Sequence, residues 1–446
     1  MEKSTPVATS KLRWYLLLVI VIMLLTLSAL HFLRKAKQQD IHGNEEDHTI
    51  HQSVVHNTNG SIVVQIHGYE HNVTNVTQES IVHINDPEQE NTTWRCVNPD
   101  YIGDNARTSV ALLKVHKAGS TTIASILYRF GIRRRLSFIM QKDNTHQFWP
   151  KTIDKAYKGF YPACRDDKYD ILNIHSRYNG RDILTNYMRE DTYVIAPLRH
   201  PMDQMMSGLY YYGYINKLKK MGKTIEEFLD NPNILTNDPL AMRLMWNSMS
   251  SVIGLDDFDI PKGSKKSYLI SKPKYIKEID RFLNWTEENI DFFLIREKFD
   301  ESLILLKDRL GWRIEDLVYF SLNAAAEPPK RNRRDTNRLR IKTEEFSYID
   351  YLLYERMKLK LDRMIEEKGA ELEVEVSKLR SLNKEFSEYC LEKVEVDPTL
   401  YGAVKILGNK VKNEHKDNKC CHQTALNELQ YVGEIKKYMA NSCGLD

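Results

Sequence analysis

The chain has 446 residues, which is more than one hydrophobic core usually organises, so one large or two modest domains are expected. A hydrophobic content of 42% and an aromatic content of 10% are typical of a globular protein and exclude a disordered or fibrous one. The net charge of +3 is nearly balanced, which argues against a general nucleic-acid-binding protein. Affinity for an anion must therefore come from a local cluster of basic residues.

An apolar segment near the N-terminus predicts a membrane anchor. Residues 14–33, WYLLLVIVIMLLTLSALHFL, contain no Asp, Glu, Lys or Arg, and about 20 apolar residues span a bilayer as a helix. The alternative, a cleaved signal peptide, is disfavoured because the apolar core is long and no Ala-x-Ala site follows it. We therefore expect a single transmembrane signal-anchor after a cytosolic tail of residues 1–13.

The polar segment 34–95 is expected to be a glycosylated lumenal stem. Basic residues flank the anchor on both sides, so the positive-inside rule does not decide the orientation. Asn-x-Ser/Thr sequons decide it, because glycosylation marks a lumenal chain. The sequons begin at Asn59, Asn72, Asn75, Asn91 and Asn284. We expect a type II membrane protein whose stem is a solvated spacer, with SIVVQI and SIVHI as candidate short strands.

The cysteines fit an oxidising compartment. They are Cys96, Cys164, Cys390, Cys420, Cys421 and Cys443. No Cys-x-x-Cys pair occurs, so a zinc site is not expected. Six cysteines allow 15 pairings, and the sequence does not choose among them.

A strand, a loop and a helix follow one another from residue 109. The run SVALLKV (109–115) is short and apolar and contains β-branched residues, as a buried strand does. In TTIASILYRFG the apolar residues recur at helical spacing, and Gly131 is the predicted C-terminal stop of the helix. The loop between them is KVHKAGSTT (114–122).

Three later segments extend this alternation. YDILNIH (169–175) and TYVIAPLRH (192–200) are predicted buried strands, and Pro201 then suits the first turn of a helix. Residues 291–312 predict another strand and an amphipathic helix that closes near Gly311. Strands that alternate with helices predict an α/β fold with a P-loop-like parallel sheet flanked by helices.

An added C-terminal helical region is expected beyond the sheet. Residues 345–390 are highly charged and helical in period, and their charges are most simply a solvated face. The basic segment PPKRNRRD (328–335) separates the two regions and is interpreted as an exposed linker. Two alternatives remain open for it, a convertase-type cleavage site and a surface that steers an acidic substrate.

The loop at 114–122 has the chemistry of an anion site. A loop between a buried strand and a helix N-terminus presents unpaired backbone N–H groups and partial positive charge. Glycine allows close approach of the backbone, hydroxyls add donors, and lysine can contact a phosphate oxygen. The candidate cofactor-binding residues are Lys114, Lys117, Ala118, Gly119, Ser120, Thr121 and Thr122. The Walker pattern is absent because the lysine precedes the glycine, which disfavours ATP; the alternative is an ordinary helix cap.

A second anion element is predicted at the end of the 192–200 strand. Arg199 ends this strand, and Ser207 lies eight residues later, about two turns along the next helix. Adjacent parallel strand ends open onto one crevice, where α/β folds bind ligands. Two phosphate sites there would suit a nucleotide phosphorylated at two places. Alone, Arg199 could equally cap a strand or pair with an acid.

These motifs carry a resemblance. LLKVHKAGSTT followed by ILYRFG resembles the 5′-phosphosulfate loop of the sulfotransferases, and PLRHPMDQMMSGLYYYG resembles their 3′-phosphate element. The closest similarity within that superfamily is to the galactose 3-O-sulfotransferases, the group that includes galactosylceramide sulfotransferase. It runs from about Cys96 to the end, through FDESLILLKDRLGWRIEDLVYFSLNA and ALNELQY. AAEPPKRNRR after LNA departs from the family pattern, and a third cofactor motif is not visible.

The resemblance implies a Golgi membrane enzyme whose catalytic domain is residues 96–446. The implied donor is 3′-phosphoadenosine 5′-phosphosulfate (PAPS), and the implied acceptor is the 3-hydroxyl of galactose on a glycolipid or glycan, with no metal required. Lys117 would donate to the bridging oxygen, the N–H groups of 118–122 would hold the 5′-phosphate, and Arg199 with Ser207 would hold the 3′-phosphate.

Histidine is the natural base for a hydroxyl nucleophile. His175 is the first candidate, because it ends a predicted strand beside the loop and the resemblance covers its His-x-Arg. His116 is the second, and it could instead orient Lys117 or contact the substrate. His200 belongs to the cofactor turn and is less favoured.

Three rival functions are weighed against this one. A sulfotransferase for another sugar hydroxyl, such as that of a uronic acid or a hexosamine, would share the cofactor motifs and differ in its acceptor pocket. A catalytically silent glycan-binding protein would be favoured had Lys117 or Arg199 been lost, but both are present. A nucleotide kinase is disfavoured by the missing Walker lysine and the predicted lumenal setting.

Overall fold

The computed structural model describes residues 52–56, 62–66, 105–142, 147–153, 159–235, 238–322, 326, 333–397 and 404–443. The chain divides into two compact units, Met1–Thr92 and Thr93–Asp446. In the first, β1 (Gln52–His56) and β2 (Ile62–Ile66) form an antiparallel hairpin, so the predicted spacer contains regular structure and the IVVQI part of SIVVQI is a strand. SIVHI lies outside the described residues.

The predicted anchor at 14–33 and four of the predicted glycosylation sites (Asn59, Asn72, Asn75 and Asn91) also lie outside the described residues. Among the helices that the structure does describe, none is both long and apolar enough to cross a bilayer. The fifth sequon residue, Asn284, is exposed on α10 (Pro273–Asn289), and its Oδ1 accepts a hydrogen bond from Arg356 Nη2 at 2.9 Å.

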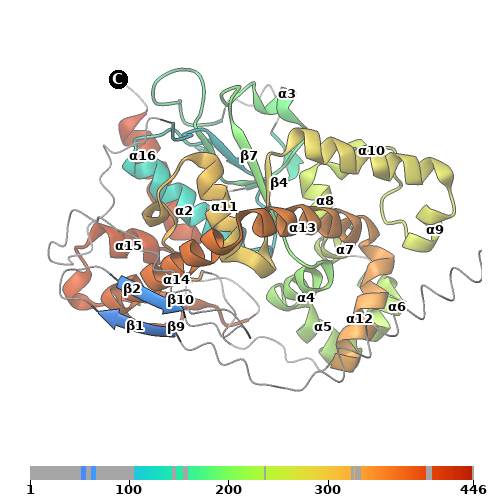
Figure 1. The fold of residues 1–446 in the computed structure, drawn as a ribbon. Helices are drawn as coiled ribbons and strands as arrows, with labels where there is room; N and C mark the ends of the chain where they lie inside the picture. The colour runs from blue at the N-terminus through green and yellow to red at the C-terminus, as the bar shows by residue number, and fades with distance from the viewer. Residues whose placement is uncertain are drawn as a thin grey trace, which may run out of the picture. The chain divides into compact units, whose positions relative to one another are not determined.

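A four-stranded parallel sheet forms the centre of the second unit and confirms the predicted α/β class. Its order is β5 (Ile171–Leu172), β3 (Val110–Leu112), β7 (Tyr193–Leu198) and β8 (Phe292–Ile295). All three pairings are parallel. The strands are short and almost wholly buried, as expected where helices cover both faces. Figure 1 shows β7 amid the surrounding helices.

The helices that follow the sheet strands begin and end largely where their sequences indicate. After β3 comes α2 (Ser120–Arg133); after β7 comes α4 (Pro201–Tyr211), with its proline in the first turn as predicted. After β8 comes α11 (Phe299–Leu310), which Gly311 ends in a left-handed conformation at φ 65°, also as predicted.

Two local predictions are wrong. Gly131 does not end its helix, because α2 continues to Arg133. A side chain at 131 would begin 2.5 Å from both Ile171 and Phe138, so this glycine allows close packing of the helix on its neighbours. The segment 169–175 is not one strand either.

The chain of the predicted 169–175 strand leaves the central sheet after β5. His175 then begins β6 (His175–Arg177), which pairs in parallel with β4 (Gln147–Thr152) in a separate two-stranded sheet. The split matters for the site, because it places His175 at the start of a new strand and not at the end of an old one.

The C-terminal region is helical, as predicted, with one added hairpin. It contains α12 (Arg333–Phe346), α13 (Tyr348–Lys368), α14 (Ala370–Cys390), β9 (Leu391–Val396), β10 (Leu407–Val411), α15 (Lys419–Ala425) and α16 (Glu428–Ser442). Gly369, at φ 55°, separates α13 from α14. Helix α12 begins inside the basic segment 328–335, so the last residues of the predicted linker are helical.

Shorter helices complete the unit. They are α3 (Arg181–Leu184), α5 (Tyr214–Lys220), α6 (Ile225–Asp230), α7 (Pro239–Met245), α8 (Ser248–Ile253), α9 (Lys266–Ile270) and the 3₁₀ turns η1 (Pro232–Leu235), η2 (Leu255–Asp257), η3 (Arg296–Lys298), η4 (Ile314–Leu317) and η5 (Asn413–His415). Helices α4, α5, α6, α7 and α12 share a second hydrophobic core beside the main one. That core fixes α4, and with it the turn that carries Arg199.

One disulfide ties the end of α16 to an earlier part of the unit, and another joins α14 to α15. Cys164 is bonded to Cys443, and Cys390 to Cys421. Cys420 is also disulfide-bonded, so the two adjacent cysteines belong to different crosslinks. The oxidising compartment that the cysteine content predicts stays a prediction.

Candidate functional site

The loop between β3 and α2 contains two residues with a left-handed backbone, a conformation that favours glycine. Gly119 caps α2 in the left-handed region at φ 89°, and Lys117 is also left-handed at φ 58°. A Cβ atom at position 119 would lie 2.8 Å from Cδ of Arg296, which packs over the loop. Glycine at this position therefore lets the Arg296 side chain lie directly against the backbone of the loop.

The hydroxyls of the loop are largely committed to the protein itself. Ser120 Oγ donates to the carbonyl of Val115 at 2.9 Å, and Thr121 Oγ1 donates to Glu428 Oε2 at 3.1 Å. Thr122 and Ala118 are buried. The first turn of α2 contains no acidic residue, so its backbone N–H groups retain the partial positive charge that an anion needs.

Lys117 lies in an environment that favours a bound anion. Burial, followed by repulsion from Arg199, lowers the pKa of Lys117 to about 8. Its ammonium lies 3.7 Å from the centre of the Tyr211 ring, and Arg199 Nη1 donates to the Lys117 carbonyl at 3.2 Å. A phosphate between these two cations would relieve their repulsion, so the residues present fit a phosphorylated ligand.

Ser207 shares a face of α4 with Tyr211. The two are four residues apart, which places them on one side of the helix, and Tyr211 contacts Lys117. Because β3 and β7 are neighbours in the sheet, their carboxyl ends bring the loop and the Arg199 turn together. The structure thus joins the two elements that the sequence treated as separate phosphate sites.

Two residues that follow β8, which the sequence analysis did not single out, also lie at this edge of the sheet. Arg296 packs over Gly119 and is exposed, so it adds a third cation to this edge of the sheet. Glu297 accepts hydrogen bonds from the backbone N–H of His200 at 2.9 Å and from Tyr354 OH at 3.2 Å, which holds the Arg199 turn. The signal available in the sequence was that Arg296 follows a predicted strand, as Arg199 does.

The two candidate bases lie face to face. The rings of His116 and His175 are stacked, with centroids 4.1 Å apart and an interplanar angle of 3°. Burial lowers the pKa of His116 to about 4, so this imidazole is neutral at neutral pH. His175 Nδ1 lies 2.8 Å from the carbonyl of Lys114, which can only accept, so Nδ1 carries a hydrogen.

Glu428 is the other residue that sequence reasoning missed. Helix α16 places its carboxylate against the buried ammonium of Lys114, and Oε1 lies 3.7 Å from His175 Nε2. Lys114 Nζ also donates to Tyr431 OH at 3.2 Å. The Lys114 side chain thus has two protein partners, and its direct contact with a cofactor stays a prediction.

A metal centre is not indicated by the described part of the chain. Within it, no group of three or more His, Cys, Asp or Glu side chains could hold a metal ion. The positive charge at the loop comes from lysine, arginine and a helix N-terminus. That the reaction requires no metal stays a prediction.

A loop of this shape at the carboxyl edge of a parallel sheet, with cations from two neighbouring strand ends, defines an α/β protein of the phosphate-binding-loop class. The comparison with known families narrows this class. The profile of the galactose-3-O-sulfotransferases matches residues 13–439, so the chain belongs to the galactose-3-O-sulfotransferase family. That membership confirms the resemblance that the motifs carry and makes the chain a sulfotransferase enzyme.

Individual relatives extend over most of the chain. Galactose-3-O-sulfotransferase 2 of Mus musculus is 25% identical over 362 residues, which cover 77% of this chain and 88% of the relative. The Homo sapiens protein of the same name is 27% identical over 351 residues, or 74% and 83% of the two chains. Galactosylceramide sulfotransferase of Homo sapiens is 26% identical over 351 residues, or 74% and 78%.

Proposed function

We propose that this protein transfers a sulfuryl group from PAPS to the 3-hydroxyl of galactose at the end of a glycolipid or a glycoprotein glycan. The observation that carries the proposal is the meeting of Lys117 and Arg199 at the loop that precedes α2. The names of the family and of one relative specify galactose and the 3-O position, another relative's name specifies galactosylceramide, and these names support the acceptor.

The donor would be held by residues of the loop and of the strand ends. Backbone N–H groups of 118–122 face the 5′-phosphate in this proposal, and Arg199 with Ser207 face the 3′-phosphate. PAPS supplies the sulfuryl group when it is bound. Lys117, which is half-buried and cationic below its pKa of about 8, stabilises negative charge on the departing phosphate oxygen.

His175 is proposed as the base that takes the proton of the galactose hydroxyl. Since Nδ1 donates to the Lys114 carbonyl, Nε2 is the nitrogen that can accept a proton. Glu428, 3.7 Å from Nε2, would stabilise the imidazolium that forms. The ring of His116, which is stacked on His175, is neutral, so it does not repel a proton on His175.

The test is sulfate transfer from labelled PAPS to galactose-terminated acceptors, with linkage analysis of the product and without added metal. We expect label on the 3-hydroxyl of galactose for at least one glycolipid or N-acetyllactosamine acceptor. Lys117→Ala should abolish transfer, while Lys277→Ala, an exposed lysine on α10, should leave it unchanged. Label on a hexosamine or a uronic acid would overturn the galactose assignment.

We also propose that the protein is a type II membrane protein of the Golgi with a lumenal catalytic unit. The sequons, the apolar segment 14–33 and the disulfides of the second unit support this location. The full chain expressed in cells should carry N-linked glycans that a glycosidase removes. Its catalytic unit should resist protease in intact microsomes, and digestion there would contradict the proposed orientation.

A further inference from the structure

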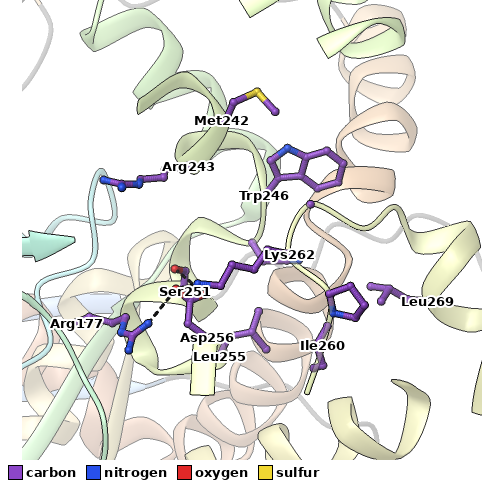
Figure 2. A pocket seen from close by; sticks show the side chains of 13 residues that line it. Arg177, Met242, Arg243, Trp246, Ser251, Leu255, Asp256, Ile260, Lys262 and Leu269 are labelled. Atoms are coloured by element: carbon purple, nitrogen blue, oxygen red, sulfur yellow. Dashed lines mark hydrogen bonds and ion pairs between the residues drawn. The ribbon is translucent and has the colours of Figure 1, made fainter. Parts of the chain in front are cut away.

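A cavity of about 400 Å³ lies next to the strand that begins at His175, and its lining includes none of the proposed donor-binding residues. It is bounded by β6, α7, α8, the loop at 255–263 and α9 (Figure 2). Its volume is in the range of ordinary small-molecule sites, roughly 300–1,000 Å³. It is large enough for one or two sugar rings and too small for a lipid with two acyl chains.

The cavity shares its walls with the proposed catalytic centre. Arg177 lines it and lies two residues beyond His175 on β6, which is about 7 Å along a strand. On the other side, Gln204 Nε2 donates both to the carbonyl of His116 at 2.9 Å and to Ser248 Oγ at 3.3 Å. Ser248 follows the lining residue Asn247, so the cavity and the histidine pair are connected through neighbouring residues on both sides.

Trp246 gives one wall of the cavity an aromatic surface. Its indole packs perpendicular to the Phe346 ring, with ring centroids 4.9 Å apart and an interplanar angle of 83°. A side chain at Gly263 would begin 3.8 Å from Cε2 of this indole, in contact with the ring. Glycine, here at φ 72°, therefore leaves that part of the ring uncovered. The indole Nε1 is buried and makes no hydrogen bond to any described residue.

The opposite end of the cavity holds a polar cluster. Asp256 accepts hydrogen bonds from Arg177 Nη1 at 3.0 Å, from Lys262 Nζ at 2.9 Å and from Ser251 Oγ at 3.3 Å. Figure 2 shows this cluster apart from the indole, with the Arg177–Asp256 contact dashed. The cluster offers donors and acceptors for hydroxyl groups, and its ion pairs are poor neighbours for a hydrocarbon chain.

We propose that this cavity binds the second sugar of the acceptor, with one face of that sugar against Trp246 and its hydroxyls toward Asp256, Arg177 and Lys262. An aromatic face next to a few convergent polar groups matches a sugar, which has an apolar C–H face and a polar edge. The inference rests on the proposed function, in which the terminal galactose lies at His175. In this proposal the enzyme recognises a disaccharide and does not contact the lipid or peptide to which the disaccharide is attached.

The experiment compares two acceptors, methyl β-galactoside and lactose, with the purified full chain. We expect kcat/KM for lactose to exceed that for the monosaccharide by about tenfold, the size of one good aromatic contact. In Trp246→Leu the ratio should fall to about one, with kcat/KM for methyl β-galactoside unchanged. Lys277→Ala should keep the wild-type ratio.

Should Trp246→Leu fail to fold, Lys262→Ala replaces it, because the Lys262 side chain is 71% exposed. We expect this variant to lower the lactose preference about threefold, as loss of one hydrogen bond does. Equal use of the two acceptors by the wild type, or an unchanged preference in the folded variants, would overturn the inference while the proposed function stands.

Binding of lactose, followed by saturation-transfer NMR, separates this inference from the proposed function. If no galactoside is sulfated, the proposed function fails. Lactose signals that are present in the wild type and lost in Trp246→Leu would still support the cavity. Equal signals in the two proteins would overturn it.

Discussion

Replacing Glu428 by Gln should destabilise the protein, because it removes the carboxylate that pairs with the buried ammonium of Lys114. The Lys114 side chain is 2% exposed and the Glu428 side chain 20% exposed, so the variant leaves an ammonium buried without its carboxylate. Removal of one partner from a buried ion pair costs about 3–5 kcal/mol. The partial exposure of Glu428 puts the expected loss at the lower end, about 3 kcal/mol, of which about 0.5 kcal/mol is lost interaction with the helix dipole at the start of α16.

Thermal unfolding of a double-mutant cycle measures this effect. In a Lys114→Met background, Glu428→Gln should cost only the dipole share, so the two changes should be strongly non-additive. The control is Glu434→Gln on the same helix, whose partner Lys437 is 73% exposed. Exposed pairs contribute under about 1 kcal/mol. A melting temperature that falls equally in Glu428→Gln and Glu434→Gln would refute the reasoning.

Three further predictions concern the loop and the bases. Affinity for adenosine 3′,5′-bisphosphate should fall as the pH rises above 8, because Lys117 loses its proton there; calorimetry should show this fall in the wild type and none in Lys117→Met. Gly119→Ala should weaken the same binding, since its Cβ would clash at 2.8 Å, whereas Gly222→Ala, with φ 65° and open space around it, controls for backbone strain in the same assay. His175→Ala should lower turnover by about 10²–10⁴ with unchanged nucleotide affinity, and near wild-type turnover would assign the base to His116.

The elements around the donor site could be predicted because their signals are local. Each predicted strand is a short apolar run, and each helix has a stop or start residue next to it, such as Pro201 or Gly311. Arg199 could be assigned to the loop because adjacent parallel strands end at one edge. Gly131 misled the prediction, since glycine serves both as a helix stop and as a place for close packing, and only the neighbours distinguish the two.

Glu428 was missed although it lies in ALNELQY, one of the segments that carry the family resemblance, because nothing in that segment indicates a contact with the loop. It lies 314 residues from Lys114, and its own surroundings are an ordinary helix start with a capping Asn427. The acceptor cavity was equally hidden. Its lining comes from separate short helices and a loop, so no single stretch of the sequence contains it. Trp246, taken by itself, cannot be told from an ordinary core residue in the sequence.

The distance along the chain between Lys114 and Glu428 has a consequence for biosynthesis. A nascent chain carries its phosphate loop long before the ribosome has made α16, so the Lys114 ammonium has no carboxylate until 428 of 446 residues exist. Cys164 likewise waits for Cys443. The ion pair between Lys114 and Glu428 therefore forms only after α16 has been made, and a chain that stops before α16 lacks it.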